Sequence, residues 1–415
     1  MRRDRLLGWV LSVCFCSSVA CGGSLSPGSG DYRWISESRP LREGAGALKV
    51  LWRATLTPSK RGNYRPLEHA VAAIDPNLRR VYVGADSGTL RAFTLGGQLL
   101  YRFELHERIG SELALDSESD ELYVGTERGE LFSFAPGQGE LRWRSTSVGA
   151  IRQKPVLFRD AVYIITEEDT VEALARADGS MLWSFRRDRA DEFLVAGHAG
   201  LHLGDDGTLY AAFSDGSVIA LDALDGSVKW ERNTSVDAPE TEPGRPRYVD
   251  VDTTPVVLGD QVFAASFGAG LYCLDRHNGS VLWREPNWTG IVGMAASVEG
   301  DALILVSADL GVARFSLTGR QARWLKPSER GAFGVPRLSS DLVLIGDSTG
   351  SLVALSAASG QEVGRIDSGH GFVAPAAVRD DLGFVVTNGG ALLALRVAQG
   401  EKARPETSQP ALDRR

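Results

Sequence analysis

The stretch ALDALDGSVKW, at residues 220–230, alternates apolar and polar side chains, turns at Asp225-Gly226, alternates again and ends on a tryptophan. Two close variants follow the same pattern, ALARADGSMLW at 173–183 and CLDRHNGSVLW at 273–283. Alternation is typical of a half-buried β-strand, and Asp-Gly or Asn-Gly between two such runs is typical of a tight hairpin turn. Each copy therefore predicts two antiparallel strands, the second of which carries a tryptophan.

The copies belong to a longer repeat with a period of roughly 40 residues, which indicates a closed or stacked array of similar units. Each unit contains four short strands, and the fourth often carries a tryptophan, namely Trp143, Trp183, Trp230, Trp283 and Trp324. Tyr101 stands in its place in the first unit, and Gly364 lies near that place in the seventh. The first strands are expected within residues 69–75, 111–117, 154–160, 200–206, 254–260, 293–299, 335–341 and 374–380.

The eighth unit lacks its fourth strand, because the chain turns polar after residue 399. A spare strand with the same alternation and a tryptophan, Trp52, occurs near the N-terminus in LKVLWRATL, residues 48–56. An N-terminal strand that completes the last unit closes the ring and removes exposed sheet edges. The sequence therefore predicts an all-β protein, an eight-bladed β-propeller of four-stranded blades over residues 48–399, rather than an open array.

The first 20 residues combine a basic start with a short apolar run, which is the pattern of an export signal rather than a membrane-spanning helix. The run ends in SSVAC and resembles a bacterial lipoprotein signal, in which Cys21 is lipidated; an ordinary cleaved signal peptide is the alternative. Residues 21–47 are then a lipidated cysteine and flexible tether, and residues 400–415 a disordered polar tail.

The composition argues against nucleic-acid binding, because the 415-residue chain has a formal net charge of −8 and no run of basic residues. Once the signal is removed, Cys21 and Cys273 are the only cysteines, so no disulfide within the chain is expected. Gly346-Asp-Ser348-Thr-Gly350 matches a hydrolase nucleophile motif, but it lies between two strands where that chemistry needs a strand-to-helix elbow. Neither a metal nor a cofactor is predicted.

The opening repeat resembles the tryptophan-docking repeat of pyrroloquinoline-quinone propeller proteins, many of which are dehydrogenases. Within that family the tryptophans wedge between blades, so Trp52 and the five tryptophans named above are expected to be structural. The enzymes of that class need in addition a calcium site, a catalytic aspartate and, in many members, a vicinal cysteine pair. This sequence has no vicinal cysteine pair and no evident calcium cluster. A quinone- or ligand-binding propeller with an enzymatic or sensing role is nevertheless the alternative function.

A second resemblance involves residues 248–283, which begin YVDVDTTPVV and contain the third copy of the repeat, together with LIGDSTGSLVAL at 344–355. These stretches resemble the outer-membrane protein assembly lipoproteins, the propeller components of the β-barrel assembly machinery. The resemblance implies a non-enzymatic scaffold, lipid-anchored in the outer membrane and facing the periplasm. It also implies binding, as one copy in a multi-subunit complex, to the periplasmic domains of the central barrel-assembly subunit.

By the same resemblance, the partner contacts involve Asp250 and Asp252 and a loop ahead of the fourth unit, here Phe193, Leu194 and Val195. The family pattern in that loop has an arginine before a glycine, and this chain has Ala196 before Gly197 instead. Asp250 and Asp252 alternate with Val251, so on an extended segment they point the same way and form an acidic face. The alternative is that the two aspartates cap backbone groups where a blade begins.

Overall fold

The computed structural model describes residues 41–44, 46–57, 68–188, 199–240, 248–328, 331–348 and 350–398. They all belong to one compact unit of the chain, Ile35–Arg415. Within these ranges the chain forms β-strands and a single turn of 3-10 helix, η1 (Ser235–Asp237), and no helix is long and apolar enough to cross a membrane. The expected export signal, Cys21 and the polar tail lie outside the described residues.

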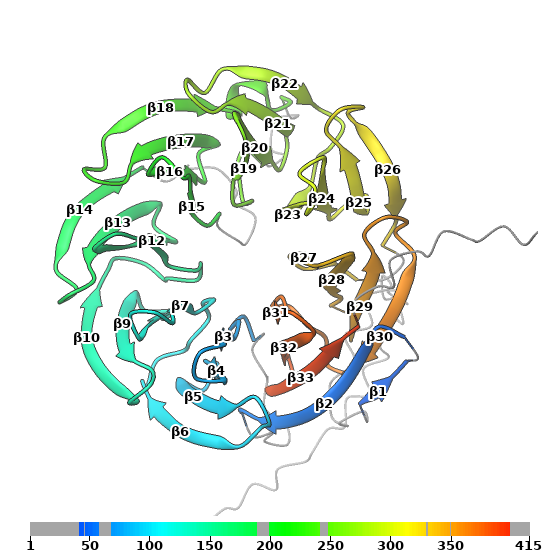
Figure 1. Ribbon diagram of the computed structural model, residues 1–415. Coiled ribbons are helices and arrows are strands. Elements are labelled where there is room, and N and C mark those ends of the chain that lie inside the picture. Colours follow the sequence, from blue (N-terminus) through cyan, green and yellow to red (C-terminus); the bar gives the residue numbers. More distant parts are fainter. Residues whose placement is uncertain are drawn as a thin grey trace, which may run out of the picture. The chain divides into compact units, whose positions relative to one another are not determined.

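The strands form eight antiparallel sheets arranged as the blades of a ring, so the predicted eight-bladed propeller is confirmed (Figure 1). In each blade the first strand lies nearest the centre and the last at the rim. Blades 1 to 4 comprise β3 (Ala73–Asp75), β4 (Arg80–Val83), β5 (Thr89–Thr94) and β6 (Leu99–Glu104); β7 (Ala114–Asp116), β8 (Glu121–Gly125), β9 (Glu130–Ala135) and β10 (Glu140–Thr146); β11 (Val156–Phe158), β12 (Ala161–Thr166), β13 (Thr170–Ala175) and β14 (Met181–Arg186); and β15 (His202–Leu203), β16 (Thr208–Ala212), β17 (Ser217–Asp222) and β18 (Val228–Asn233).

The second half of the ring repeats this order. Blades 5 to 8 comprise β19 (Val256–Leu258), β20 (Gln261–Ser266), β21 (Gly270–Asp275) and β22 (Val281–Glu285); β23 (Ile291–Ala296), β24 (Ala302–Ser307), β25 (Gly311–Ser316) and β26 (Gln321–Lys326); β27 (Arg337–Ser339), β28 (Leu342–Gly346), β29 (Ser351–Ser356) and β30 (Glu362–Asp367); and β31 (Ala377–Arg379), β32 (Leu382–Thr387), β33 (Ala391–Val397) and β2 (Leu48–Thr55). β23 begins at Ile291, earlier than the expected 293–299.

The N-terminal strand closes the ring, as the sequence predicts. β2 pairs antiparallel with β33 from Leu48↔Val397 to Thr55↔Ala391. In Figure 1 the blue β2 accordingly lies beside the red β33, although the two come from opposite ends of the chain. Leu48 and Leu56, at either end of the segment, are buried at 2% and 0% exposure, so the closure is packed as well as hydrogen-bonded.

Blade 7 has a fifth strand that the repeat did not predict. β1 (Arg42–Glu43) pairs with β30, and the chain then crosses from blade 7 to the rim of blade 8. This crossing explains the missing tryptophan, since a Cβ on Gly364 would lie 3.0 Å from the backbone nitrogen of Ala47. Gly46 passes even closer, because its Cβ would lie 2.0 Å from the carbonyl oxygen of Val363.

The hydrophobic core is divided among the interfaces between blades. Eight clusters of buried side chains lie there, one between each pair of neighbours. The rim tryptophans join these interfaces by reaching to the following blade, where the indole nitrogens donate to backbone carbonyls in the pairs Trp52–Leu95, Trp143–Arg176, Trp183–Ala223, Trp230–Arg276 and Trp324–Ala357. Tyr101 donates in the same way to Pro136, and Trp283 packs on Phe315 of blade 6.

Candidate partner-binding surface

One face of the ring carries the connections that lead from the rim strand of one blade to the innermost strand of the next. Because the strands of a blade alternate in direction, the turn between its second and third strands lies on the same face as the chain's exit to the next blade. We call this the connection face. The connections between blades 3 and 4, residues 187–201, and between blades 4 and 5, residues 234–255, are long, and the structure describes only their two ends. Loops on a rigid scaffold are where binding residues are concentrated.

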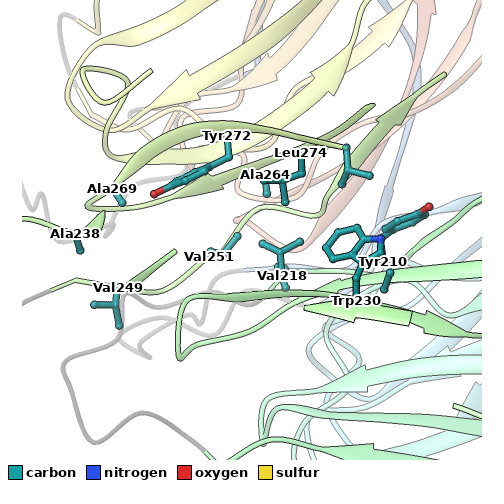
Figure 2. Close-up of a cluster of buried hydrophobic side chains, with 14 residues drawn as sticks. Tyr210, Val218, Trp230, Ala238, Val249, Val251, Ala264, Ala269, Tyr272 and Leu274 are labelled. Atoms are coloured by element: carbon teal, nitrogen blue, oxygen red, sulfur yellow. The ribbon is translucent and has the colours of Figure 1, made fainter. Parts of the chain in front are cut away.

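The segment Tyr248–Pro255, which leads into β19, is held between the turns of two blades. The backbone N–H of Val251 donates to Phe213 of blade 4 over 3.3 Å, and the N–H of Phe267 of blade 5 donates to the carbonyl of Asp250 over 2.9 Å. The alternate side chains, Val249 and Val251, are 3% and 1% exposed. Figure 2 shows both valines in the apolar cluster between blades 4 and 5, which also contains Trp230.

The two threonines of the same block also have structural contacts. The hydroxyl of Thr253 accepts the N–H of Ala265 over 3.2 Å, inside blade 5. The hydroxyl of Thr254 accepts the N–H of Gly200 over 2.8 Å and so joins blade 5 to the start of blade 4. Most of the block therefore serves to dock blades 4 and 5 together.

The two aspartates lie together, but they do not form an exposed acidic pair. Asp250 is only 1% exposed and Asp252 is partly buried, so the acidic face that the two were expected to form is closed to solvent at Asp250. Burial, and then the hydrogen bond and charge of Asp250, raise the pKa of Asp252, with a further contribution from Asp169 of blade 3. The physical reason is that the valines on one side of the extended segment enter the apolar interface between blades 4 and 5, which draws the aspartates on the other side out of solvent. Asp169 of blade 3 lies near enough to Asp252 to affect its charge.

This arrangement makes the stability of the ring depend on pH. An unfolded aspartate loses its proton near pH 3.9, whereas folded Asp252 keeps its proton to higher pH. The stabilisation is therefore complete below about pH 4 and is lost as the pH rises toward the raised pKa. We expect Asp252→Asn to increase the free energy of unfolding at pH 8 by about 1–3 kcal/mol and to change it little at pH 4, as measured by denaturant unfolding.

A matched control for this prediction is Asp225→Asn, which removes a carboxyl group on the opposite face whose pKa is lowered by Ser227. The control should show no gain at pH 8. Equal gains for Asp252→Asn at both pH values would contradict the prediction, because they would point to packing rather than to the bound proton.

The comparisons with known proteins agree on one family. The family described as "Outer membrane protein assembly factor BamB" matches residues 49–326 and 311–403 of the chain. The chain belongs to the BamB family. The BamB of Burkholderia pseudomallei is 27% identical over 82% of this chain and 86% of its own length. That of Bordetella pertussis is 24% identical over 87% of this chain and 99% of its own.

Solved structures support the same fold. The crystal structure of BamB from Moraxella catarrhalis matches with a TM-score of 0.66 and 20% identity, over 80% of this chain and 100% of that one. A quinohemoprotein alcohol dehydrogenase from Pseudomonas putida HK5 matches with a TM-score of 0.63 and 12% identity, over 88% and 78%. At these identities both likenesses bear on the fold alone, so the family assignment depends on the sequence.

In this BamB-family chain, the other predicted contact residues, Phe193, Leu194 and Val195, lie outside the described residues and stay a prediction. The structure adds candidates that sequence reasoning missed. Val236, in η1, is 70% exposed, and Tyr248 is 37% exposed with its ring centroid 5.5 Å from that of Phe267. Val236, Tyr248 and Phe267 all lie on the connection face, in the exit from blade 4, in the entry to blade 5 and in a turn of blade 5. Alternation could not have revealed them, because they lie in a turn and an irregular segment.

Among the described residues, no group of three His, Cys, Asp or Glu side chains is placed to hold a metal ion. Cys273 lies buried in β21, and burial raises the pKa of its thiol to about 12. Cys273 therefore acts as a small apolar residue of the core rather than as a reactive thiol.

Proposed function

We propose that this chain is a non-enzymatic scaffold in the assembly of outer-membrane β-barrel proteins. It is anchored by lipid on Cys21, faces the periplasm and binds the periplasmic part of the barrel-forming subunit as one copy in a multi-subunit complex. The observation that carries the proposal is the family match over nearly the whole propeller, to relatives named outer membrane protein assembly factor. The lipid anchor is supported by the SSVAC pattern at residues 17–21.

The scaffold role is preferred to the quinone-binding alternative on the chemistry of the chain. The sequence has no vicinal cysteine pair, and its match to a quinohemoprotein alcohol dehydrogenase is at 12% identity. The repeated tryptophans also occur in such enzymes, but here their role is structural, because their indole nitrogens donate hydrogen bonds to backbone carbonyls of the next blade.

We place the partner contact on the connection face of blades 4 and 5. Its support is the exposed apolar surface of Val236 and Tyr248, next to a segment held rigidly by blades 4 and 5. Exposed apolar side chains on a rigid segment are typical of the centre of a protein interface. Asp250 is buried and would therefore hold the segment in place rather than contact the partner. The partner role of Asp252 is thereby limited to the part of its side chain that remains accessible.

The test is co-purification from detergent-solubilised envelopes, using the full chain with an affinity tag. We expect the wild-type protein to recover the barrel-forming subunit and Val236→Asp to recover at least tenfold less, since burying a carboxylate in an apolar contact is costly. The matched control is Val298→Asp, because Val298 is also 70% exposed but lies in the first turn of blade 6, on the opposite face.

The same experiment separates anchoring from binding. Cys21→Ala should leave the outer-membrane fraction at high salt if Cys21 carries the lipid. Failure of the wild-type protein to recover any membrane barrel would overturn the scaffold role. Equal losses for Val236→Asp and Val298→Asp would instead overturn the assignment of the face.

A further inference from the structure

The centre of the ring contains a cavity that the scaffold role does not use. It has a volume of about 430 Å³ and lies between the innermost strands of blades 7, 8, 1 and 2, with Lys154 of blade 3 at its edge. Its backbone walls come from β3, β7, β27 and β31. Its charged side chains are Glu112, Lys154, Arg337 and Arg379. Three cations and one anion therefore share a small space in a chain whose formal net charge is −8.

Glu112 lies at the centre of this charge cluster. One of its carboxylate oxygens lies 3.1 Å from Nζ of Lys154, and the other pairs with the guanidinium of Arg337. Arg337 belongs to blade 7 and Glu112 to blade 2, so the ion pair spans the cavity. The two residues are 225 positions apart in the sequence. The Glu112 side chain is 18% exposed, whereas those of Lys154 and Arg337 are 54% and 37% exposed, so both cations remain accessible from the cavity.

The simplest interpretation is that this ion pair stabilises the ring by joining blades 2 and 7, but that role leaves the excess of positive charge in the cavity unexplained. Partly exposed ion pairs contribute only about 0–1 kcal/mol to stability, so this ion pair adds little to the free energy of unfolding. One carboxylate also cannot neutralise three cations. Arg379, at the end of β31, lines the same cavity, is exposed and makes no ion pair with any described residue.

We propose that the central cavity binds a small anion that carries two or more carboxylate or phosphate groups, and that Glu112 occupies one of the anion positions when the cavity is empty. Arginine presents a planar fork that matches carboxylate and phosphate oxygens, and lysine adds a point charge. A cleft lined mainly by one sign of charge with low-dielectric walls concentrates counter-ions.

The roles of the four side chains differ in a way that gives the proposal its test. Arg379 supplies attraction alone, whereas Arg337 and Lys154 supply attraction and also pair with Glu112. Glu112 opposes a bound anion, because its carboxylate competes for the same donors. Removing the Glu112 charge should therefore strengthen binding, whereas a purely structural ion pair predicts no such gain.

The experiment is isothermal titration calorimetry on the full-length protein purified in detergent. Citrate, inorganic phosphate and acetate are each titrated into the protein at constant ionic strength. We expect saturable binding of citrate at one site, weaker binding of phosphate and none of acetate. Glu112→Gln should tighten the citrate Kd about tenfold and Arg379→Gln should weaken it about tenfold, as expected for one charge at close range. Arg323→Gln, which removes an exposed arginine from the rim strand β26, is the matched control and should change nothing.

Three results would each overturn the proposal. They are non-saturable citrate binding in the wild-type protein, an equal effect of Arg379→Gln and Arg323→Gln, and a weaker or unchanged Kd in folded Glu112→Gln. If Glu112→Gln fails to fold, the Kd of Arg379→Gln still decides the question. Arg379 makes no ion pair with any described residue, so its substitution is not expected to disturb the fold. Tighter binding of phosphate than of citrate would assign the site to phosphate groups rather than carboxylates.

Discussion

Deletion of residues 48–56 is expected to abolish the cooperative unfolding transition of the propeller. The deleted segment supplies the whole of β2, which pairs with β33 over most of its length. It also removes two buried leucines and Trp52, whose ring lies 5.8 Å from Phe384 of blade 8 and 5.9 Å from Phe93 of blade 1. Losses of about 2–5 kcal/mol for each buried side chain add up to the 5–15 kcal/mol that stabilises a typical domain.

The measurement is thermal and denaturant unfolding followed by circular dichroism. A deletion of equal length from the polar tail, residues 401–409, is the control and should leave the transition unchanged. A circular permutant provides a sharper test, in which residues 48–57 follow residue 398 through a short turn. Leu48 already lies opposite Val397, so the moved strand would form an ordinary hairpin with β33.

The permutant should regain a single cooperative transition, because its last blade is complete without the chain ends meeting. If the deletion unfolds at the same temperature as the wild-type protein, then closure by β2 contributes nothing to the ring. If the permutant stays unfolded while the wild-type protein is stable, the strand matters for a reason other than pairing.

Trp230→Ala is expected to have the second largest effect, a loss of about 3–5 kcal/mol in the free energy of unfolding. The side chain is 7% exposed, and its ring centroid lies 5.9 Å from that of Tyr210. Its indole nitrogen donates to the carbonyl of Arg276 in blade 5 over 2.7 Å. The substitution therefore opens a cavity at the blade 4–5 interface and removes a hydrogen bond across it. Leu282→Ala on the neighbouring rim strand, where the side chain is 47% exposed, should cost no more than about 0.5 kcal/mol.

A double-mutant cycle with Gly279 tests whether the tryptophan and the turn of the next blade act together. Gly279 has a φ of +68°, and a Cβ there would lie 2.5 Å from the Trp230 ring. Gly279→Ala should therefore be costly in the wild-type protein and clearly less so in Trp230→Ala, since only the backbone strain then remains. Strict additivity of the two substitutions would contradict docking of the indole on this glycine.

Much of the fold follows from local features of the sequence. Alternation and Asp-Gly or Asn-Gly turns act between neighbouring residues, so the hairpins within each unit are visible without any knowledge of the fold. The number of blades follows from counting these units, and the closure follows from one missing strand and one spare strand with its Trp52. Family membership follows in the same way, because the match over residues 49–326 and 311–403 depends on local sequence.

The contacts between segments that are distant in the sequence were decided only by the tertiary structure. β1 pairs with the rim strand of blade 7 before the chain crosses to blade 8, and Gly364 replaces a tryptophan because the crossing leaves no room for a side chain. The alternation around Val251 placed Asp250 and Asp252 on one side of the segment, but it could not tell whether that side faces water or blade 3. The meeting of Arg337 with Glu112 depends on ring closure itself, since only the closed ring brings blades 7 and 2 to opposite sides of one cavity.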